Sequence, residues 1–282
     1  MIQKTLYVSD MDGTLLNDQS VLSPQTISLL NEAIDKHQAL FTIATARTPA
    51  TIVDMMRPIH TSLPLIVMAG AAFWDNHLLQ YKDVQAIPTK VIEQLLLLFA
   101  QNDIHPFVYR RNGNQIQAYH INHFTPAEEQ FIGQRISTPF KRLITTDMLL
   151  AENPDECMLI FCMGEFTKLR AVTDQLEAMQ IDCSPVCYHD IFNESQGILE
   201  IYASGTTKAS AIHRLAKQVQ AERIVVFGDN LNDLPMMRNA THSLAVSNAF
   251  DEVKQAADEI IGSNNEDAVA QWIMTDILQS QQ

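Results

Sequence analysis

The sequence has little positive charge. It holds 19 lysine and arginine residues against 33 aspartate and glutamate residues, and its formal net charge is -14 over 282 residues. Such an acidic chain repels polyanions, which argues against nucleic acid or an anionic membrane surface as a partner. Any anionic small molecule must therefore be held by a local positive site, against the field of the whole protein.

Long apolar runs are missing as well. The longest, Pro64 to Trp74, is well short of the roughly 18 residues that a membrane-spanning helix needs. The mixed first residues reach an acid at Asp10, so no secretory signal is expected. We therefore expect a cytoplasmic protein without a membrane partner, and the oligomeric state stays open between monomer and homodimer.

Cysteine is scarce, with four residues at Cys157, Cys162, Cys183 and Cys187. Cys183 and Cys187, with His189 nearby, are a possible metal-binding group, but their spacing is looser than in typical zinc sites. Reduced thiols packed inside a cytoplasmic protein are the favoured interpretation.

Short, continuously apolar segments alternate with helical patterns at both ends of the chain. Strands are expected at 6–9, 39–44, 64–68, 198–203, 223–227, 243–246 and 259–261. Helices are expected at 24–37, 49–56, 206–219, 234–239, 251–257 and 267–277. Apolar strands separated by helices are typical of a parallel sheet that is covered on both faces. We therefore predict the α/β class, with a doubly wound, Rossmann-like core.

The pattern changes between residues 85 and 190. Asn112-Gly113 is a strong hairpin signal between two strand-like segments, 105–110 and 115–121. Further helices (91–100, 126–135, 167–179) and strands (156–163, 181–188) follow in mixed order. This mixture indicates an α+β domain at 85–190, inserted into a core made of residues 1–84 and 191–282.

Two acids stand directly behind the first strand, in the stretch Asp10-Met11-Asp12-Gly13-Thr14. Side chains two apart in an extended segment point the same way, so both carboxylates are expected on one face. Gly13 allows the backbone to turn sharply after them. Asp-Gly is also an ordinary turn signal, and the stretch alone does not decide between a turn and a site.

Polar residues also follow other predicted core strands. Thr45 and Arg47 follow the second strand, Lys208 opens the helix after strand 198–203, and residues 228–233 follow strand 223–227. In open α/β sheets, ligands bind outside the carboxyl ends of the strands. We therefore expect these residues to meet Asp10 at one site.

The expected site is rich in acids: Asp10, Asp12, Asp229 and Asp233. Clustered carboxylates repel one another unless they share a proton or bind a cation, and hard oxygen ligands favour Mg²⁺. Lys208, the Thr45 hydroxyl and backbone N–H groups are typical phosphate ligands. Together they predict Mg²⁺-assisted phosphoryl transfer, with one carboxylate free to act as the nucleophile.

In this order, the motifs resemble the haloacid dehalogenase (HAD) superfamily of phosphatases. The residues that carry the resemblance are Asp10-Met11-Asp12-Gly13-Thr14, Thr45, Lys208 and Gly228-Asp229-x-x-Asn232-Asp233. Ser247-Asn248-Ala249 and Ser263-Asn264-x-Glu266-Asp267 are similar to its Cof-type subfamily, in which the insert is a C2B cap domain. The motifs are specific as an ordered set and span nearly the whole core, whereas the insert resembles a cap in size and pattern only.

Three positions depart from the family pattern. Ala46 and Ala268 stand where Gly is usual, and Ala69 stands where Asn is usual. Ala46 keeps a backbone N–H for phosphate but restricts the turn, and Ala69 lacks an amide that would orient the first strand or the substrate. No catalytic motif residue is lost, so activity is expected.

The resemblance implies a role for each motif residue. Asp10 would attack phosphorus and become an aspartyl phosphate, while Asp12 would protonate the leaving alcohol and then activate water. The implied Mg²⁺ ligands are Asp10, the backbone carbonyl of Asp12, Asp229 and, directly or through water, Asp233. The implied phosphate ligands are Thr45, Lys208, Asn232 and the N–H groups of Met11 and Ala46. Arg47 would either contact the substrate or pair with a core acid.

The leading hypothesis is Mg²⁺-dependent hydrolysis of small phosphorylated metabolites, with sugar phosphates as the first expectation. A cap over the site would exclude macromolecules and select among substrates by contacts with the leaving group. Flavin mononucleotide-type and pyridoxal phosphate-type substrates stay open, as does a phosphomutase. A signalling receiver module is disfavoured by the early position of Asp10 and by the long insert. A catalytically weak phosphometabolite-binding protein is suggested only by Ala46 and Ala69.

Overall fold

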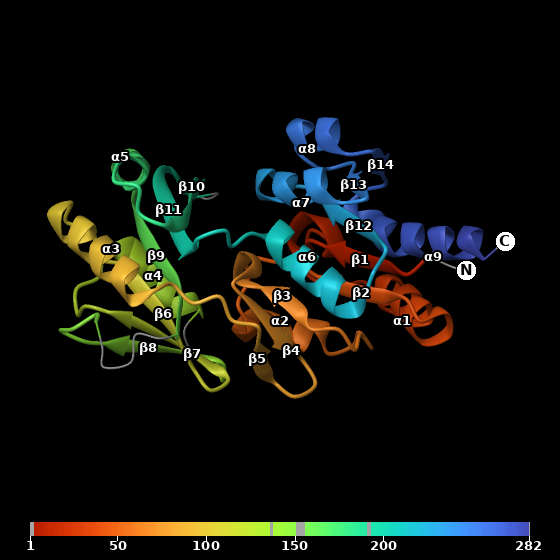
Figure 1. Ribbon diagram of the computed structural model, residues 1–282, viewed down its shortest axis with the longest axis horizontal. Coiled ribbons are helices and arrows are strands. Elements are labelled where there is room, and N and C mark those ends of the chain that lie inside the picture. Colours follow the sequence, from red (N-terminus) through yellow and green to blue (C-terminus); the bar gives the residue numbers. More distant parts are fainter. Residues whose placement is uncertain (1–2, 136–137, 151–155, 191–192, 282) are drawn as a thin grey trace. The chain divides into compact units, whose positions relative to one another are not determined.

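The computed structural model describes residues 3–135, 138–150, 156–190 and 193–281, and the chain forms two compact units (Figure 1). Unit 1 comprises Met1–Lys82 and Thr207–Gln282, and unit 2 comprises Asp83–Thr206. Unit 2 is thus a single continuous insert between the two halves of unit 1.

Unit 1 is built on a five-stranded sheet with the order β14-β13-β12-β1-β2, and every neighbouring pair in it is parallel. Its strands are β1 (Thr5–Ser9), β2 (Leu40–Ile43), β12 (Arg223–Gly228), β13 (His242–Val246) and β14 (Glu259–Ile261). The inner strand β1, between β12 and β2, has no exposed surface at Leu6 or Val8. This is the burial expected of a parallel strand that is covered on both faces, and the predicted α/β class is confirmed.

The helices of unit 1 are α1 (Pro24–His37), α2 (Pro49–Met56), α6 (Lys208–Val219), α7 (Leu234–Asn239), α8 (Asp251–Ala256) and α9 (Ala268–Ser280). From β1 the chain crosses to β2 in one direction, and from β12 it crosses to β13 and β14 in the other. Because such crossovers are right-handed, α1 lies on one face of the sheet and α7 and α8 lie on the opposite face. Consistently, α1 packs against α9, whereas α7 packs against α6 and α8.

The predicted third core strand, β3 (Leu65–Val67), is placed differently from the expectation. It touches β2 through one parallel bridge, between Ala44 and Ile66. Its full pairing is antiparallel with β4 (Ala72–Asp75), which forms a hairpin with β5 (Gln80–Lys82). β3 joins this hairpin because the chain reverses immediately after the strand, at Met68–Gly70.

Unit 2 is a six-stranded sheet with the order β10-β11-β9-β6-β7-β8, in which only the β7–β8 pair is parallel. Its strands are β6 (Phe107–Asn112), β7 (Gln115–His120), β8 (Lys141–Thr145), β9 (Cys157–Glu165), β10 (Cys183–Asp190) and β11 (Asn193–Ala203). Its helices are α3 (Thr89–Gln101), α4 (Pro126–Arg135) and α5 (Phe166–Ala178). The α+β pattern of the insert is therefore observed, together with one strand, β8, that was not predicted.

The strand at 198–203 corrects an expectation. It was predicted to belong to the parallel core, but it forms the end of β11 in unit 2, where Ile201 pairs antiparallel with Ile160 and Pro185. A continuously apolar run is typical of any strand that is buried on both faces, so periodicity does not distinguish the two kinds of sheet.

The cysteines lie in unit 2 and all four are free. Cys157 and Cys162 have no exposed surface and belong to the apolar core that α3 and α5 share with the sheet. Burial raises the pKa of the Cys157 thiol to about 12 and that of Cys183 to about 11, so both remain protonated and packed. No group of potential metal ligands in the described ranges contains a cysteine.

None of the helices in the described part of the chain combines the length and apolar character that crossing a bilayer requires.

Candidate active site

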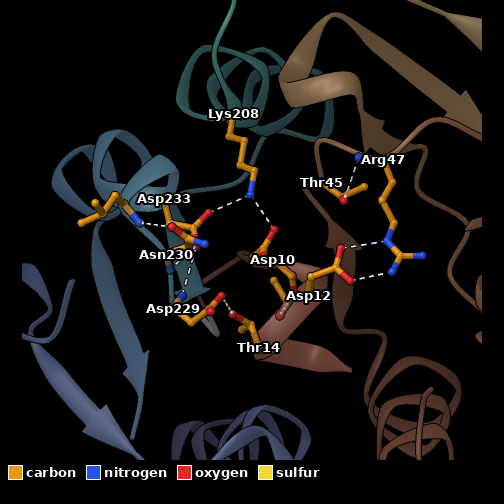
Figure 2. A network of polar contacts seen from close by, with 11 residues as sticks. Asp10, Asp12, Thr14, Thr45, Arg47, Lys208, Asp229, Asn230 and Asp233 are labelled. Carbon is orange, nitrogen blue, oxygen red and sulfur yellow. Dashed lines mark hydrogen bonds and ion pairs between the residues drawn. The ribbon is translucent and has the colours of Figure 1, made fainter. Parts of the chain in front are cut away.

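Residues from four separate segments of unit 1 meet at the carboxyl end of the parallel sheet (Figure 2). Asp10 follows β1, Thr45 follows β2 and Asp229 follows β12, while Lys208 is the first residue of α6. The Thr207 side chain caps α6 by accepting a hydrogen bond from the Ser210 N–H. This cap fixes the start of α6, and Lys208 with it.

Lys208 bridges two buried carboxylates. Its Nζ lies 2.5 Å from Asp10 Oδ1 and 2.7 Å from Asp233 Oδ1. The exposed fractions are 4% for Lys208, 6% for Asp10 and 0% for Asp233. A charged group is this deeply buried only when it is paired, and here a single ammonium serves two acids.

The charge balance of this cluster is incomplete. Burial raises the pKa of Asp10 to about 8, with Lys208 opposing the rise and Asp233 and Asp229 adding to it. Burial by itself would lower the pKa of Lys208, but the Asp10 and Asp233 carboxylates raise it above its usual range. Lys208 is therefore the charged partner. The neighbouring acids cannot all ionise around one ammonium without a further cation.

Asp229 is held by the turn that follows β1. The Thr14 hydroxyl donates to Asp229 Oδ1 at 2.7 Å. Burial raises the pKa of Asp229 to about 6, the Thr14 hydrogen bond opposes the rise, and the Asp233 charge adds to it. Gly13 has φ +75°, and a Cβ there would overlap the Asp229 carboxylate. Glycine is therefore required both for the backbone conformation and for this close approach.

The donor set fits a divalent cation. Asp10, Asp229 and Asp233 each offer an oxygen, and these oxygens lie within 4.8 Å of one another. Asp233 Oδ2 already accepts the N–H groups of Asp229 (3.1 Å) and Asn230 (3.0 Å), while Oδ1 accepts from Lys208. Asp233 thus fixes the loop, and Asp10 and Asp229 have the more available oxygens. An all-carboxylate set suits a hard ion such as Mg²⁺.

Asp12 points away from Asp10, as Figure 2 shows. Its carboxylate accepts hydrogen bonds from Arg47 Nε (2.8 Å) and Arg47 Nη2 (2.6 Å), and 52% of the side chain is exposed. The expectation that both carboxylates share one face is wrong, because β1 ends at Ser9 and Asp12 lies in the turn Met11–Leu15.

The proposed phosphate ligands differ in burial and in hydrogen bonding. Thr45 is 1% exposed, and its hydroxyl accepts the Arg47 N–H at 3.1 Å. The Ala46 N–H meets no acceptor among the described residues, and Met11 begins its turn, where backbone N–H groups lack partners inside the turn. Asn232 is exposed in the turn Leu231–Asp233.

We predicted no role for the residues that hold the turn Met11–Leu15 in place. Besides Thr14, Asn248 donates to the Gly13 carbonyl at 2.7 Å and accepts the Asn264 N–H at 3.0 Å. Asn264 in turn donates to the Leu16 carbonyl at 3.0 Å. Both asparagines stand in motifs that already marked the family resemblance, and this was the only available signal, because the contacts join segments far apart in the chain.

Two departures from the family pattern have different structural consequences. Ala46 is not among the described residues with positive φ, so its side chain imposes no backbone strain. Ala69 does adopt a left-handed conformation, with φ 52° and ψ 24°. Its N–H donates to the Thr45 carbonyl at 2.9 Å, which links this strained residue to a proposed phosphate ligand.

Comparison with known proteins supports this description. The family of haloacid dehalogenase-like hydrolases matches residues 7–273. The pyridoxal phosphate phosphatase of Escherichia coli is 26% identical over 278 residues, which cover 95% of this chain and 97% of that protein. The 5-amino-6-(5-phospho-D-ribitylamino)uracil phosphatase of Bacillus subtilis is 26% identical over 273 residues, with coverages of 95% and 94%.

The fold has close counterparts among solved structures. A haloacid dehalogenase-like hydrolase from Bacteroides thetaiotaomicron superimposes with a TM-score of 0.76 at 22% identity, covering 97% of this chain and 100% of that one. The family match confirms the predicted resemblance to Cof-type members of the superfamily and the prediction that the chain is an enzyme. The protein belongs to the haloacid dehalogenase-like hydrolases.

Proposed function

We propose that this protein hydrolyses small phosphate monoesters through an aspartyl phosphate on Asp10, with Mg²⁺ as its metal. The observation that carries the proposal is the buried Asp10–Lys208–Asp233 cluster next to Asp229. Asp10 attacks as a carboxylate; Lys208 and a bound cation would favour this ionised form and offset its repulsion by a phosphate dianion.

The substrate class follows from the relatives. The E. coli and B. subtilis proteins are named for pyridoxal phosphate and for a phosphorylated ribitylaminouracil. These molecules share a phosphate ester on a small polar compound and little else. We assign this class to the chain and, as the resemblance implies, place sugar phosphates first within it.

The first half-reaction uses both acids. An oxygen of Asp10 forms a bond to phosphorus, and the bond between phosphorus and the leaving oxygen breaks, with its electron pair going to that oxygen. Asp12 supplies the proton that the leaving alcohol needs. Thr45, Lys208 and the Ala46 N–H surround the phosphoryl oxygens, where charge accumulates.

The second half-reaction returns Asp10 to its starting state. The Asp12 carboxylate takes a proton from water, whose oxygen forms a bond to phosphorus. The bond between phosphorus and Asp10 breaks, and its electron pair returns to the carboxylate. One residue thus serves as acid and then as base, which is efficient because each half-reaction restores the form that the other requires.

The remaining ligands complete the proposed site. Bound Mg²⁺ would neutralise part of the charge on the phosphate and on the acids. Asp10, Asp229 and the Asp12 backbone carbonyl would hold it, with Asp233 in support. Asn232 and the Met11 N–H would add phosphate contacts. The four free thiols fit a reducing compartment, so we place the enzyme in the cytoplasm.

Phosphate release from an aryl phosphate and from a panel of sugar, nucleotide and cofactor phosphates, with Mg²⁺ and with EDTA, tests the proposal. We expect Mg²⁺-dependent release, and full activity in EDTA would refute the metal. Formation of an isomeric sugar phosphate without free phosphate would indicate a phosphomutase. Tight binding of these esters without turnover would indicate a binding protein.

A further inference from the structure

We infer that Arg47 acts on the reaction through Asp12, as the residue that positions the acid/base carboxylate, and not as a phosphate ligand. The inference rests on the proposed function. Two parallel N–H···O bonds, of 2.8 and 2.6 Å, join the guanidinium to both oxygens of Asp12. Such a bidentate contact fixes the plane of the carboxylate as well as its distance, which a lysine could not do.

Arg47 is the anchored member of the pair. The Arg47 Nη1 lies 3.5 Å from the Met55 sulfur on α2. The backbone N–H of Arg47 donates to the Thr45 hydroxyl, and its backbone carbonyl accepts the Met68 N–H at 3.0 Å. Its side chain is 24% exposed, against 52% for Asp12. The Arg47 backbone is therefore held on both sides, and its side chain is the more buried member of the pair.

The direction of the guanidinium also separates it from the phosphate position. Figure 2 shows the Asp12 carboxylate between Arg47 and Asp10, whereas Lys208 approaches Asp10 from another side. Of the three guanidinium nitrogens, Nε and Nη2 donate to Asp12 and Nη1 faces Met55. A phosphate on Asp10 would therefore meet Lys208 and Thr45 while Arg47 remains on Asp12.

The pairing has a different consequence for each half-reaction. Both Asp12 oxygens accept N–H groups from Arg47 in this arrangement. An ionised carboxylate accepts in this way with both oxygens, and this is the form that the base requires. To act as the acid, Asp12 must free one oxygen and turn it toward the leaving group. An ion pair that is partly exposed contributes little free energy, so opening it in this way costs little.

The test uses two variants of Arg47 and one background substitution. Arg47→Met removes the positive charge and the bidentate contact, whereas Arg47→Lys keeps the charge but can contact the carboxylate at one point only. Both are made in the wild-type protein and in Asp12→Asn, and turnover of an aryl phosphate is measured. Binding of inorganic phosphate is measured by calorimetry, which does not depend on turnover. Thermal unfolding checks that each variant is folded.

We expect Arg47→Met to lower kcat on the order of 10- to 100-fold, which is the scale of losing the orientation of one acid/base. Phosphate affinity should change less than about twofold, and Arg47→Lys should restore part of kcat. In the Asp12→Asn background, removing Arg47 should have almost no further effect, because residues that act as a unit are not additive.

Two results would overturn the inference. One is a large loss of phosphate affinity in Arg47→Met, which would make Arg47 a phosphate ligand. The other is an equal loss of turnover in the wild-type and Asp12→Asn backgrounds, which would make Arg47 independent of Asp12. Failure of the proposed function is distinguishable from both, since the wild-type protein would then release no phosphate.

Discussion

The ammonium of Lys208 lies 2.5 Å from the carboxylate of Asp10, although 198 residues separate them in the chain. The whole of unit 2 stands between them in sequence. The contact therefore joins the first strand of the parallel sheet to the helix with which the chain returns to unit 1. The site cannot form until both halves of unit 1 have come together.

Lys208→Met should abolish turnover and destabilise the protein. The substitution leaves Asp10 and Asp233 buried without their shared cation, and breaking such a pair costs about 3 kcal/mol. Urea unfolding and phosphate release measure the two effects. Lys217→Met, at an exposed position on the same helix, is the matched control and should leave both unchanged. Near-wild-type turnover in Lys208→Met would remove the lysine from the mechanism.

Gly13→Ala should lose more activity than its loss of stability explains. Its φ of +75° and the adjacent Asp229 carboxylate both oppose a Cβ. Gly113, with φ +62° and no atom within 4 Å of the position that a Cβ would take, offers the same backbone strain without the contact. Gly113→Ala should cost about 1 kcal/mol and retain full activity. Equal activity losses in both variants would show that the close approach to Asp229 has no functional weight.

Ala69→Gly and Ala69→Asn should stabilise the protein by about 0.5–1 kcal/mol. At φ 52° the Ala69 methyl group is strained, whereas glycine and asparagine tolerate the left-handed region. Ala71, at φ -66°, provides the contrast, because Ala71→Gly should destabilise by a similar amount. Chemical denaturation of the three variants measures the differences. A less stable Ala69→Gly would contradict the assignment of strain.

The stability of unit 2 should depend on pH through Glu200. Burial raises the pKa of this half-buried carboxyl to about 7, while hydrogen bonds from the Tyr202 and Tyr188 hydroxyls oppose the rise. The folded-state pKa lies above the ordinary value of 4.5. The protonated carboxyl therefore favours folding below pH 4.5, and this contribution is lost as the pH rises through 7.

Glu200→Gln should remove this dependence. The difference in unfolding free energy between wild type and variant should shift by at most about 3 kcal/mol between pH 4.5 and 7, with the wild type losing stability relative to the variant. Urea titrations at several pH values give this difference directly. A constant difference across the range would mean that Glu200 titrates as it does in the unfolded chain.

The sequence predicted the fold of unit 1 and the meeting of its motifs for one physical reason. Continuously apolar strands separated by helices imply a parallel sheet, and the carboxyl ends of parallel strands lie along one edge. Asp10, Thr45 and Asp229 were brought together on this basis. Lys208 was predicted through strand 198–203, which lies in the sheet of unit 2, and it reaches the site as the first residue of α6. The strand was misassigned because a continuously apolar run fits a buried strand of either kind of sheet.

The direction of individual side chains could not be predicted in the same way. Asp12 turns away from Asp10 because the strand ends between them and because Arg47 binds its carboxylate. The contacts of Asn248 and Asn264 with the turn after β1 depend on tertiary packing between distant segments. Local periodicity contains no information about such partners.

The central claim is that Asp10 carries the phosphoryl group, and the most direct test is to trap it there. The Asp12→Asn variant, in which hydrolysis of the intermediate is impaired, is mixed with Mg²⁺ and an aryl phosphate, quenched in acid, digested and examined by mass spectrometry. We predict one hydroxylamine-sensitive phosphoryl group on the peptide that contains Asp10, and none in the Asp10→Asn variant. A phosphoryl group on another residue, or wild-type turnover by Asp10→Asn, would contradict the account.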